Sequence, residues 1–225
     1  SKATMSRLFR SLGYSDFDEV REHLRAIRSV GEPRATDGPA SLPVHARAEA
    51  AAIAAALSRP AIADAVAALA DAAHVHVVGW RNSHVVALHL RQQLVQARPH
   101  VRLAPAPGQV MGEELADIEP GDVVVVVGFR RRPAGFGAFL AEAARTGARV
   151  VLVGDPSAAE HLGRIGRSGI WVECPVATDL SFDSYAAAMS LVAVLADGVL
   201  ARRGAAGRER VTGISATYQR LAEVE

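Results

Sequence analysis

The chain has 225 residues, half of them hydrophobic, and its formal net charge at neutral pH is +1. This composition is typical of a globular protein, and the length allows one full domain and part of another. The charge balance neither indicates nor excludes DNA binding, because a small DNA-reading domain needs only a local basic face. The single cysteine, Cys174, excludes an internal disulfide. With no apolar run of membrane-spanning length and no signal-peptide pattern, the sequence predicts a cytoplasmic protein without a membrane partner.

Residues 1–28 predict two short amphipathic helices. Met5, Leu8, Phe9 and Leu12 recur at helical spacing and form one apolar face. The polar and basic side chains near this start suit phosphate and base-edge contacts in a DNA groove. These candidate DNA-binding residues are Ser1, Lys2, Thr4, Ser6, Arg7 and Arg10. The alternative is a helical hairpin that only packs on its own domain, and the residues alone favour this plainer interpretation.

The same stretch resembles the recognition-helix segment of RpiR-type transcriptional regulators. The resemblance rests on residues 1–8, on Leu12-Gly13-Tyr14 and on residues 17–20. It implies a sequence-specific helix-turn-helix DNA-binding domain followed by a phosphosugar-sensing domain. In that family further helices precede this segment, and the sequence has no initiator Met. We therefore expect residues 1–28 to be the C-terminal part of a truncated DNA-binding domain.

Residues 29–43 carry three prolines and two glycines without apolar periodicity, which predicts a linker. Residues 44–225 then form the second predicted domain. After two Ala-rich helical stretches, short apolar runs alternate with helical ones. The predicted strands are 74–79, 101–104, 122–127, 149–153 and 169–173, and the predicted helices between them are 84–97, 109–118, 135–146 and 158–165. A closing helix is expected at 180–203, and the polar tail 208–225 receives no assignment.

The apolar runs lack polar alternation, as expected for strands that are buried on both faces. Strands of this kind, alternating with helices, indicate an α/β fold, a three-layer doubly wound sheet of five parallel strands. The flavodoxin-like order 2-1-3-4-5 is the expected topology. In such sheets ligands bind beyond the carboxyl ends of the strands, which singles out the loops at 79–83, 128–134 and 154–157.

The first two of these loops carry arginines at expected helix starts, where free N–H groups favour anions. The sequence contains neither a dinucleotide fingerprint nor a Walker-type phosphate loop, and its histidines show no persuasive metal-ligand spacing. We therefore expect no cofactor, no metal and a small anionic ligand. The plainer alternative places the three consecutive arginines at a subunit interface or in solvent. Asp183 has two open roles, as a cap of the closing helix or as a contact to the ligand or a neighbouring subunit.

Residues 50–203 resemble the sugar isomerase (SIS) domain that RpiR-type regulators carry. Matches include Gly79, Ser83, Gly147-Ala148 and Phe182-Asp183-Ser184. In the family, a serine of the first loop and a Ser-x-Ser-Gly-x-Thr loop after the third strand hold the ligand phosphate. Ser83 matches the first, but Gly128, Arg130 and Pro133 stand where the two serines and the threonine belong. This departure favours an anion that arginine forks recognise, either a phosphate or a carboxylate. The predicted ligand-binding residues are Arg81, Asn82, Ser83, Gly128, Phe129, Arg130, Arg131, Arg132, Asp183 and Ser184.

Together these features predict a transcriptional regulator and not an enzyme. It would bind operator DNA, sense a small anionic metabolite such as a phosphosugar or a carboxylate-bearing sugar derivative, and form a homodimer or homotetramer. The first alternative is a sugar-phosphate isomerase or lyase, for which Glu113, Glu114, His161 and Asp183 are the candidate acids and bases. The second alternative is a SIS-type oligomerisation module that binds no ligand.

Overall fold

The computed structural model describes residue 9 and residues 41–223, which form the sheet domain and its flanking helices. The chain divides into two units, Ser1–Ala35 and Thr36–Glu225, and almost all described residues belong to the second. The predicted DNA-binding residues and most of the predicted linker lie outside the described residues. The predicted linker ends at residue 43, whereas helix α3, Leu42–Leu57, begins before that residue and has Pro43 in its first turn.

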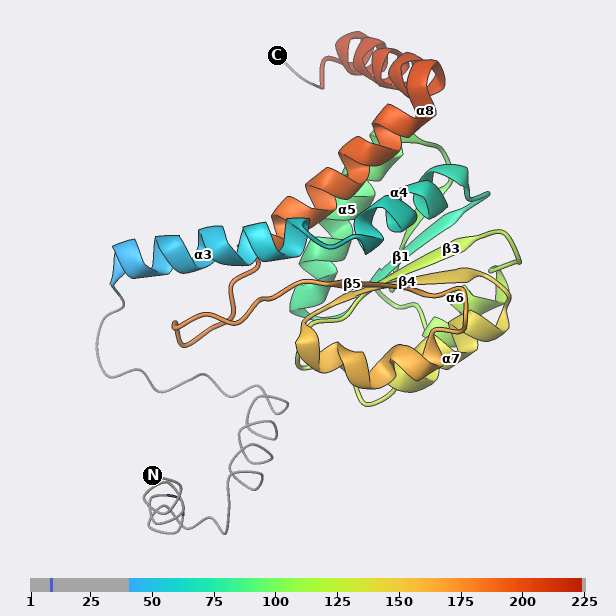
Figure 1. Cartoon of the computed structure of the whole chain (residues 1–225). Coiled ribbons are helices and arrows are strands. Elements are labelled where there is room, and N and C mark those ends of the chain that lie inside the picture. The colour runs from blue at the N-terminus through green and yellow to red at the C-terminus, as the bar shows by residue number, and fades with distance from the viewer. Residues whose placement is uncertain (1–8, 10–40, 224–225) are drawn as a thin grey trace. The chain divides into compact units, whose positions relative to one another are not determined.

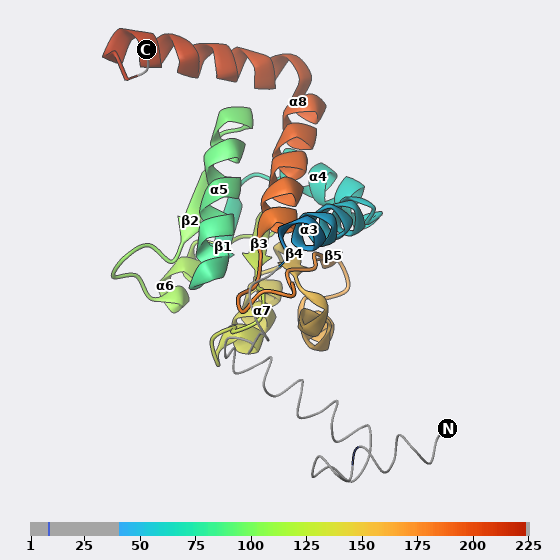
Figure 2. The same ribbon diagram turned by 90° about the vertical axis from the view of Figure 1, so that its left-hand side faces the viewer.

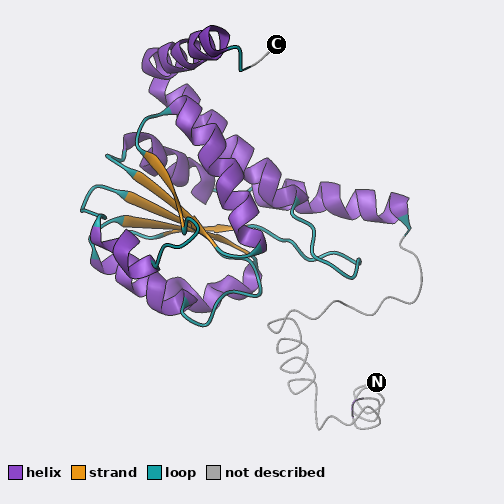
Figure 3. Ribbon diagram, turned by 180° about the vertical axis from the view of Figure 1, so that it is seen from behind, coloured by secondary structure: helices purple, strands orange, loops and turns teal. Residues whose placement is uncertain are grey.

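The sheet has five parallel strands in the order β2-β1-β3-β4-β5, which confirms the predicted topology (Figure 3). The strands are β1 Val75–Gly79, β2 Val101–Ala104, β3 Val123–Val127, β4 Arg149–Gly154 and β5 Ile170–Glu173. Each begins within one residue of its predicted start. The central strand β3 consists of five buried valines, and β1 is buried at every position. β-branched side chains suit a pleated surface that is covered on both faces.

Helices cover both faces of the sheet and make it a three-layer structure (Figures 1 and 2). One face packs on α3, on α4 (Ala61–Asp71), on α5 (Asn82–Ala97) and on α8 (Ala186–Leu221). The other face packs on α6 (Met111–Ala116), on α7 (Phe136–Arg145) and on the 3-10 helix η1 (Pro156–Arg164). The prediction of an α/β doubly wound fold is therefore confirmed. Val125 and Val124, neighbours on β3, point into the two different cores.

The closing helix differs most from its prediction. It begins at Ala186 and not near 180, because the preceding residues use their polar groups within a loop. The Ser184 N–H donates to the Val176 carbonyl at 3.0 Å, and the Thr178 hydroxyl donates to the Phe182 carbonyl at 2.9 Å. The helix also continues to residue 221, through a break at Gly204 with φ 55° and ψ −123°. The unassigned tail is thus largely helical, and in Figure 1 it turns away from the axis of the first part.

Two shorter elements also depart from expectation. The segment predicted as a helix at 158–165 is the 3-10 helix η1, which begins at Pro156 and is capped by Asp155. The Asp155 carboxylate accepts from the Ser157 N–H at 3.2 Å. No single helix among the described residues has the length and hydropathy of a membrane span. Helices α3 and α4 meet that criterion only jointly, as a pair bent by 63°.

Candidate functional site

Three loops meet at the carboxyl end of the sheet and form a small polar pocket. The β1–α5 loop contributes Arg81, the loop after β3 contributes Arg130 and Arg131, and Tyr185 precedes α8. The pocket has a volume of about 30 Å³, which is room for about one water molecule. Its full lining is Trp80, Arg81, Asn82, Ser83, Arg130, Arg131 and Tyr185. This Arg130 pocket therefore accepts a compact group as it stands, and a larger ligand has to extend over exposed Arg81 and Asn82.

The start of α5 forms one wall of the Arg130 pocket. Arg81, the residue before this helix, has φ 54° and ψ −129°, and no side chain caps the helix. An uncapped helix start presents N–H groups and the positive end of the helix dipole, both of which favour an anion. Ser83 is buried, and its hydroxyl oxygen accepts from the Phe129 N–H at 3.2 Å. Ser83 thereby joins the first loop to the loop after β3.

Arg130 forms the opposite wall, and its guanidinium is only partly satisfied. Its side chain is 7% exposed and that of Asp183 is 6% exposed. The Arg130 Nε donates to the Asp183 Oδ2, whereas the buried Nη2 has no hydrogen-bond partner among the residues that the structure describes. A buried cationic donor without a partner loses its hydration without compensation. An anion at this position would accept from the donor and lie beside the uncapped helix start.

Tyr185 closes the pocket from the side of α8. Its ring packs edge-on against Phe129, with the ring centroids 5.3 Å apart. Burial and the nearby Asp183 carboxylate raise the pKa of the Tyr185 phenol, while a hydrogen bond with Asn82 and the charges of Arg131 and Arg130 act in the opposite direction. The phenol is therefore neutral near pH 7 and keeps a proton to donate.

Arg132 points to different partners, although it directly follows Arg131. Its guanidinium donates to the Asp155 carboxylate at 3.0 Å, to the Ser157 hydroxyl at 2.8 Å and to the Gly128 carbonyl at 3.1 Å. It also lies over the Phe136 ring, 5.6 Å from the centroid. Arg132 thus joins the loop after β3 to the loop after β4 and does not line the Arg130 pocket.

Gly128 explains why a serine is absent from the start of this loop. A Cβ atom at residue 128 would lie 2.2 Å from the Phe136 ring, far inside van der Waals contact. Gly128 and the large buried ring at the start of α7 are therefore a matched pair. The Phe136 ring therefore leaves no space for any side chain at residue 128.

The structure brings together five of the ten predicted ligand-binding residues as pocket lining. Phe129 and Asp183 contact that lining from behind, through Ser83, Tyr185 and Arg130. Of the two roles left open for Asp183, the structure does not show the capping role, because the Asp183 carboxylate pairs with Arg130. Ser184 supplies that bond instead, since its hydroxyl accepts from the Ala186 N–H at 3.3 Å. The five lining residues are Arg81, Asn82, Ser83, Arg130 and Arg131.

Sequence reasoning missed Trp80 and Tyr185. Both stand next to residues that were predicted, Arg81 and Ser184, so their position in a strand-end loop was the only available signal.

The candidate acids and bases of the isomerase alternative are dispersed. Glu113 and Glu114 lie on α6, and His161 lies on η1 with its ring 5.1 Å from that of Phe136. Among the described residues, no group of three or more potential metal ligands is placed to hold an ion.

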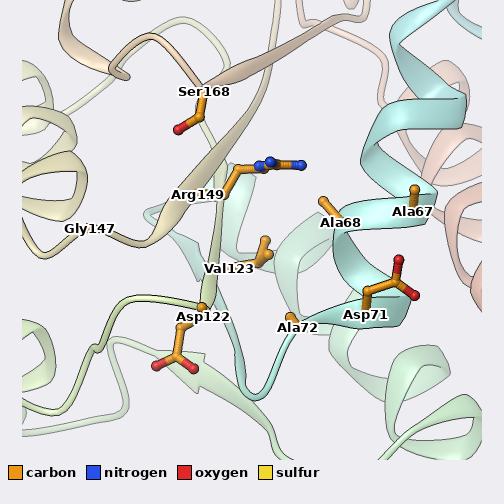
Figure 4. A pocket seen from close by; sticks show the side chains of 10 residues that line it. Ala67, Ala68, Asp71, Ala72, Asp122, Val123, Gly147, Arg149 and Ser168 are labelled. Atoms are coloured by element: carbon orange, nitrogen blue, oxygen red, sulfur yellow. The ribbon is translucent and has the colours of Figure 1, made fainter.

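A larger hollow of about 420 Å³ lies at the amino end of the sheet, between α4 and the starts of β3 and β4 (Figure 4). Its charged groups are Asp71, Asp122 and Arg149. Asp71 pairs with Arg202 at 2.8 Å, and the Asp122 carboxylate points away from Asp71. The Asp122 oxygens accept from the His74 and Glu119 N–H groups, each at 3.0 Å. With its carboxylates already paired, this hollow has weaker ligand chemistry than the carboxyl-end pocket.

Comparison with solved structures identifies the fold. The sugar isomerase domain of an RpiR transcription factor from Sphaerobacter thermophilus matches with a TM-score of 0.68 and 24% identity, over 80% of this chain and 98% of that one. The fold is that of a sugar isomerase domain. The NanR protein of Vibrio vulnificus, complexed with ManNAc-6P, matches with a TM-score of 0.66 and 17% identity, over 98% of this chain and 82% of that one. A phosphoheptose isomerase from Francisella tularensis matches with a TM-score of 0.57 and 16% identity, over 70% of this chain and 95% of that one.

At these identities the similarity concerns the fold, which transcription factors and isomerases share. No protein-family model and no curated protein matches the sequence significantly. The function therefore has to be argued from the Arg130 pocket itself.

Proposed function

We propose that this chain is a cytoplasmic, DNA-binding transcriptional regulator whose sugar isomerase-like domain senses a small anionic metabolite. The observation that carries the sensing role is the buried, unpartnered Nη2 of Arg130 in a pocket at the start of α5. Three arginines line this pocket, and only one carboxylate, that of Asp183, pairs with any of them within the described residues. A phosphate or carboxylate group supplies the missing charge and accepts from the orphaned donor.

The regulatory role rests on two further points. The N-terminal residues resemble a recognition helix, and the similar structures include an RpiR transcription factor and NanR with a bound sugar phosphate. Operator contacts are assigned to Ser1, Lys2, Thr4, Ser6, Arg7 and Arg10. We place the effector at the lining of the Arg130 pocket, with Phe129, Asp183 and Ser184 behind it, while Gly128 and Arg132 shape the loop. Two DNA half-sites require paired reading heads, so the active form is an even-numbered homo-oligomer.

To test the proposal, genomic DNA fragments that bind the protein are selected, and their affinity for the protein is measured with and without effector. A thermal-shift screen of sugar phosphates, ManNAc-6P and sugar acids supplies the effector. An anion at about 100 times its Kd stabilises the folded state by about 2.7 kcal/mol. We expect that anion to change DNA affinity about 5- to 150-fold. Arg130→Gln abolishes the anion's effect and leaves DNA binding intact, whereas Arg7→Ala weakens DNA binding.

The matched control is Arg167→Gln, which removes the same charge from an exposed position away from the pocket and changes neither response. Equal effector responses in Arg130→Gln and wild type would refute the site. Turnover of any sugar phosphate in the same screen would establish an enzyme and overturn the regulator assignment.

A further inference from the structure

Asp183 occupies the edge of Arg130 that a ligand would use. On a guanidinium, Nε and Nη2 lie on the same edge, and together they bind both oxygens of a carboxylate or phosphate. In this structure Asp183 contacts Nε, while Nη2 is buried and has no partner in the described part of the chain. The Arg130–Asp183 pair is therefore a single hydrogen bond at an edge of the guanidinium that can make two.

The remainder of the pocket gives Asp183 little support. The Asp183 carboxylate lies against Arg130, and this contact is the only hydrogen bond that it makes within the described residues. Its other neighbour, Tyr185, has its pKa raised partly by this same carboxylate. Removing two charges from water is costly, and imperfect pairing recovers that cost incompletely.

We propose that Asp183 is an internal competitor for the anion: an incoming phosphate or carboxylate displaces it from Arg130, and so frees the loop that joins β5 to α8. This inference rests on the proposed anion site. It makes Asp183 a residue that sets affinity and links occupancy to a loop. A residue that contacted the anion favourably would instead raise its affinity.

The displaced segment is defined by its own contacts. The Ser184 N–H to Val176 carbonyl bond closes a loop of residues 176–184, and Phe182 within it is 63% exposed. Asp183 lies next to Ser184, so release of its carboxylate strains or opens that bond. The loop leads directly into α8, which packs on α3, α4 and α5. Occupancy of the pocket is thereby transmitted to the helical face of the domain.

The decisive experiment is titration calorimetry of wild type and Asp183→Asn with inorganic phosphate and, separately, with acetate, at constant ionic strength. Removal of the competing charge tightens binding about tenfold, within the usual range for coupled sites. Asp179→Asn is the matched control, because it removes the same charge from an exposed position in the same loop. It changes affinity less than about twofold, as expected for a screened surface charge. The better of the two anions identifies the chemical class of the group that the pocket prefers.

Weaker anion binding by Asp183→Asn than by wild type would overturn the inference. If Asp183 only holds Arg130 in position, Asp183→Asn binds the anion more weakly than wild type does. Loss of binding in Arg130→Gln together with unchanged or weaker binding in Asp183→Asn removes this inference and leaves the anion site standing. No binding to wild type or to Asp183→Asn removes both.

A second measurement uses wild type alone and covers the case in which Asp183→Asn does not fold. Hydrogen exchange at the Ser184 amide is followed with and without the same anions. Ligand binding slows exchange across a domain in general. We expect the Ser184 amide to exchange faster in the presence of anion, against that trend. Slower or unchanged exchange at this amide contradicts displacement of Asp183.

Discussion

At the residue scale, the loop after β3 distributes its side chains in different directions. The sequence presents Arg130, Arg131 and Arg132 as one cationic cluster, and their presence near a ligand site could be predicted from the strand before them. Their separation could not, because the partners Asp183 and Asp155 lie 53 and 23 residues further along the chain. Which arginine faces a pocket depends on long-range pairs that local sequence does not encode.

Gly128 carries the clearest prediction at this scale. Gly128→Ala places a Cβ atom 2.2 Å from the Phe136 ring, which has to move within a packed core. Overpacking of this kind lowers the free energy of unfolding by about 1–3 kcal/mol. Urea unfolding of the variant measures the loss. Gly135→Ala serves as the control, since a Cβ atom there meets nothing within 4 Å. Equal stability of the two variants would show that the Phe136 ring does not constrain the loop.

At the scale of elements, the buried strands could be predicted well and the last helix poorly. Strands such as β3 are continuously apolar in sequence, and burial on both faces of the sheet follows from that pattern. The boundaries of α8 depend instead on Thr178 and Ser184, whose side-chain and backbone bonds hold the preceding loop. The predicted helix ends at residue 203, whereas the observed helix resumes after the break at Gly204.

Gly204 and Gly213 form a matched pair of tests within α8. Neither would meet another atom on gaining a Cβ, so any difference comes from the backbone. Gly204 has φ 55° and ψ −123°, which an alanine adopts only with strain of about 1–3 kcal/mol. We expect Gly204→Ala to lower the free energy of unfolding by that amount or to straighten the helix. Gly213→Ala raises it by about 0.5–1 kcal/mol, as for a glycine inside a helix. Equal changes in the two variants, measured by thermal unfolding and circular dichroism, would rule out the break at Gly204.

At the scale of the whole molecule, the two ends of the sheet carry different chemistry. Arg81, Arg130 and Arg131 line the pocket at the carboxyl end, while Asp122 lies beside His74 and His76 at the amino end. The His74 Nδ1 and the Asp122 Oδ1 are 3.0 Å apart, and the His76 Nε2 lies 3.6 Å from the Asp122 Oδ2. The carboxyl-end location of the Arg130 pocket agrees with the place that topology alone predicts for a ligand site. The histidine–aspartate group could not, because it joins two strands that the sequence separates.

This group makes folding stability depend on pH. Burial lowers the pKa of His76 below its ordinary value of 6.5, while Asp122 acts in the opposite direction and Arg102 adds to the lowering. The unfolded chain therefore binds a proton near pH 6.5 that the folded chain resists. The free energy of unfolding then falls as pH drops below about 6.5, by at most about 1.4 kcal/mol per pH unit for this group.

His76→Gln should flatten that dependence without removing it, because burial and Arg132 also lower the pKa of His161. Urea unfolding between about pH 7.5 and pH 5 measures the slope. The pKa of Asp122 is lowered as well, and its contribution is lost only at more acidic pH, below its ordinary value of 3.8. An unchanged slope in His76→Gln would contradict the assignment of the buried histidine as neutral.

The central claim is that the Arg130 pocket binds an anion, and the most direct test is a crystal structure of the protein with selenate, located by the anomalous scattering of selenium. The account predicts a selenate within hydrogen-bond distance of the Arg130 Nη2 and beside the first turn of α5, with the Asp183 carboxylate moved off Arg130. Selenate bound only elsewhere, with the Arg130–Asp183 pair intact, would contradict it.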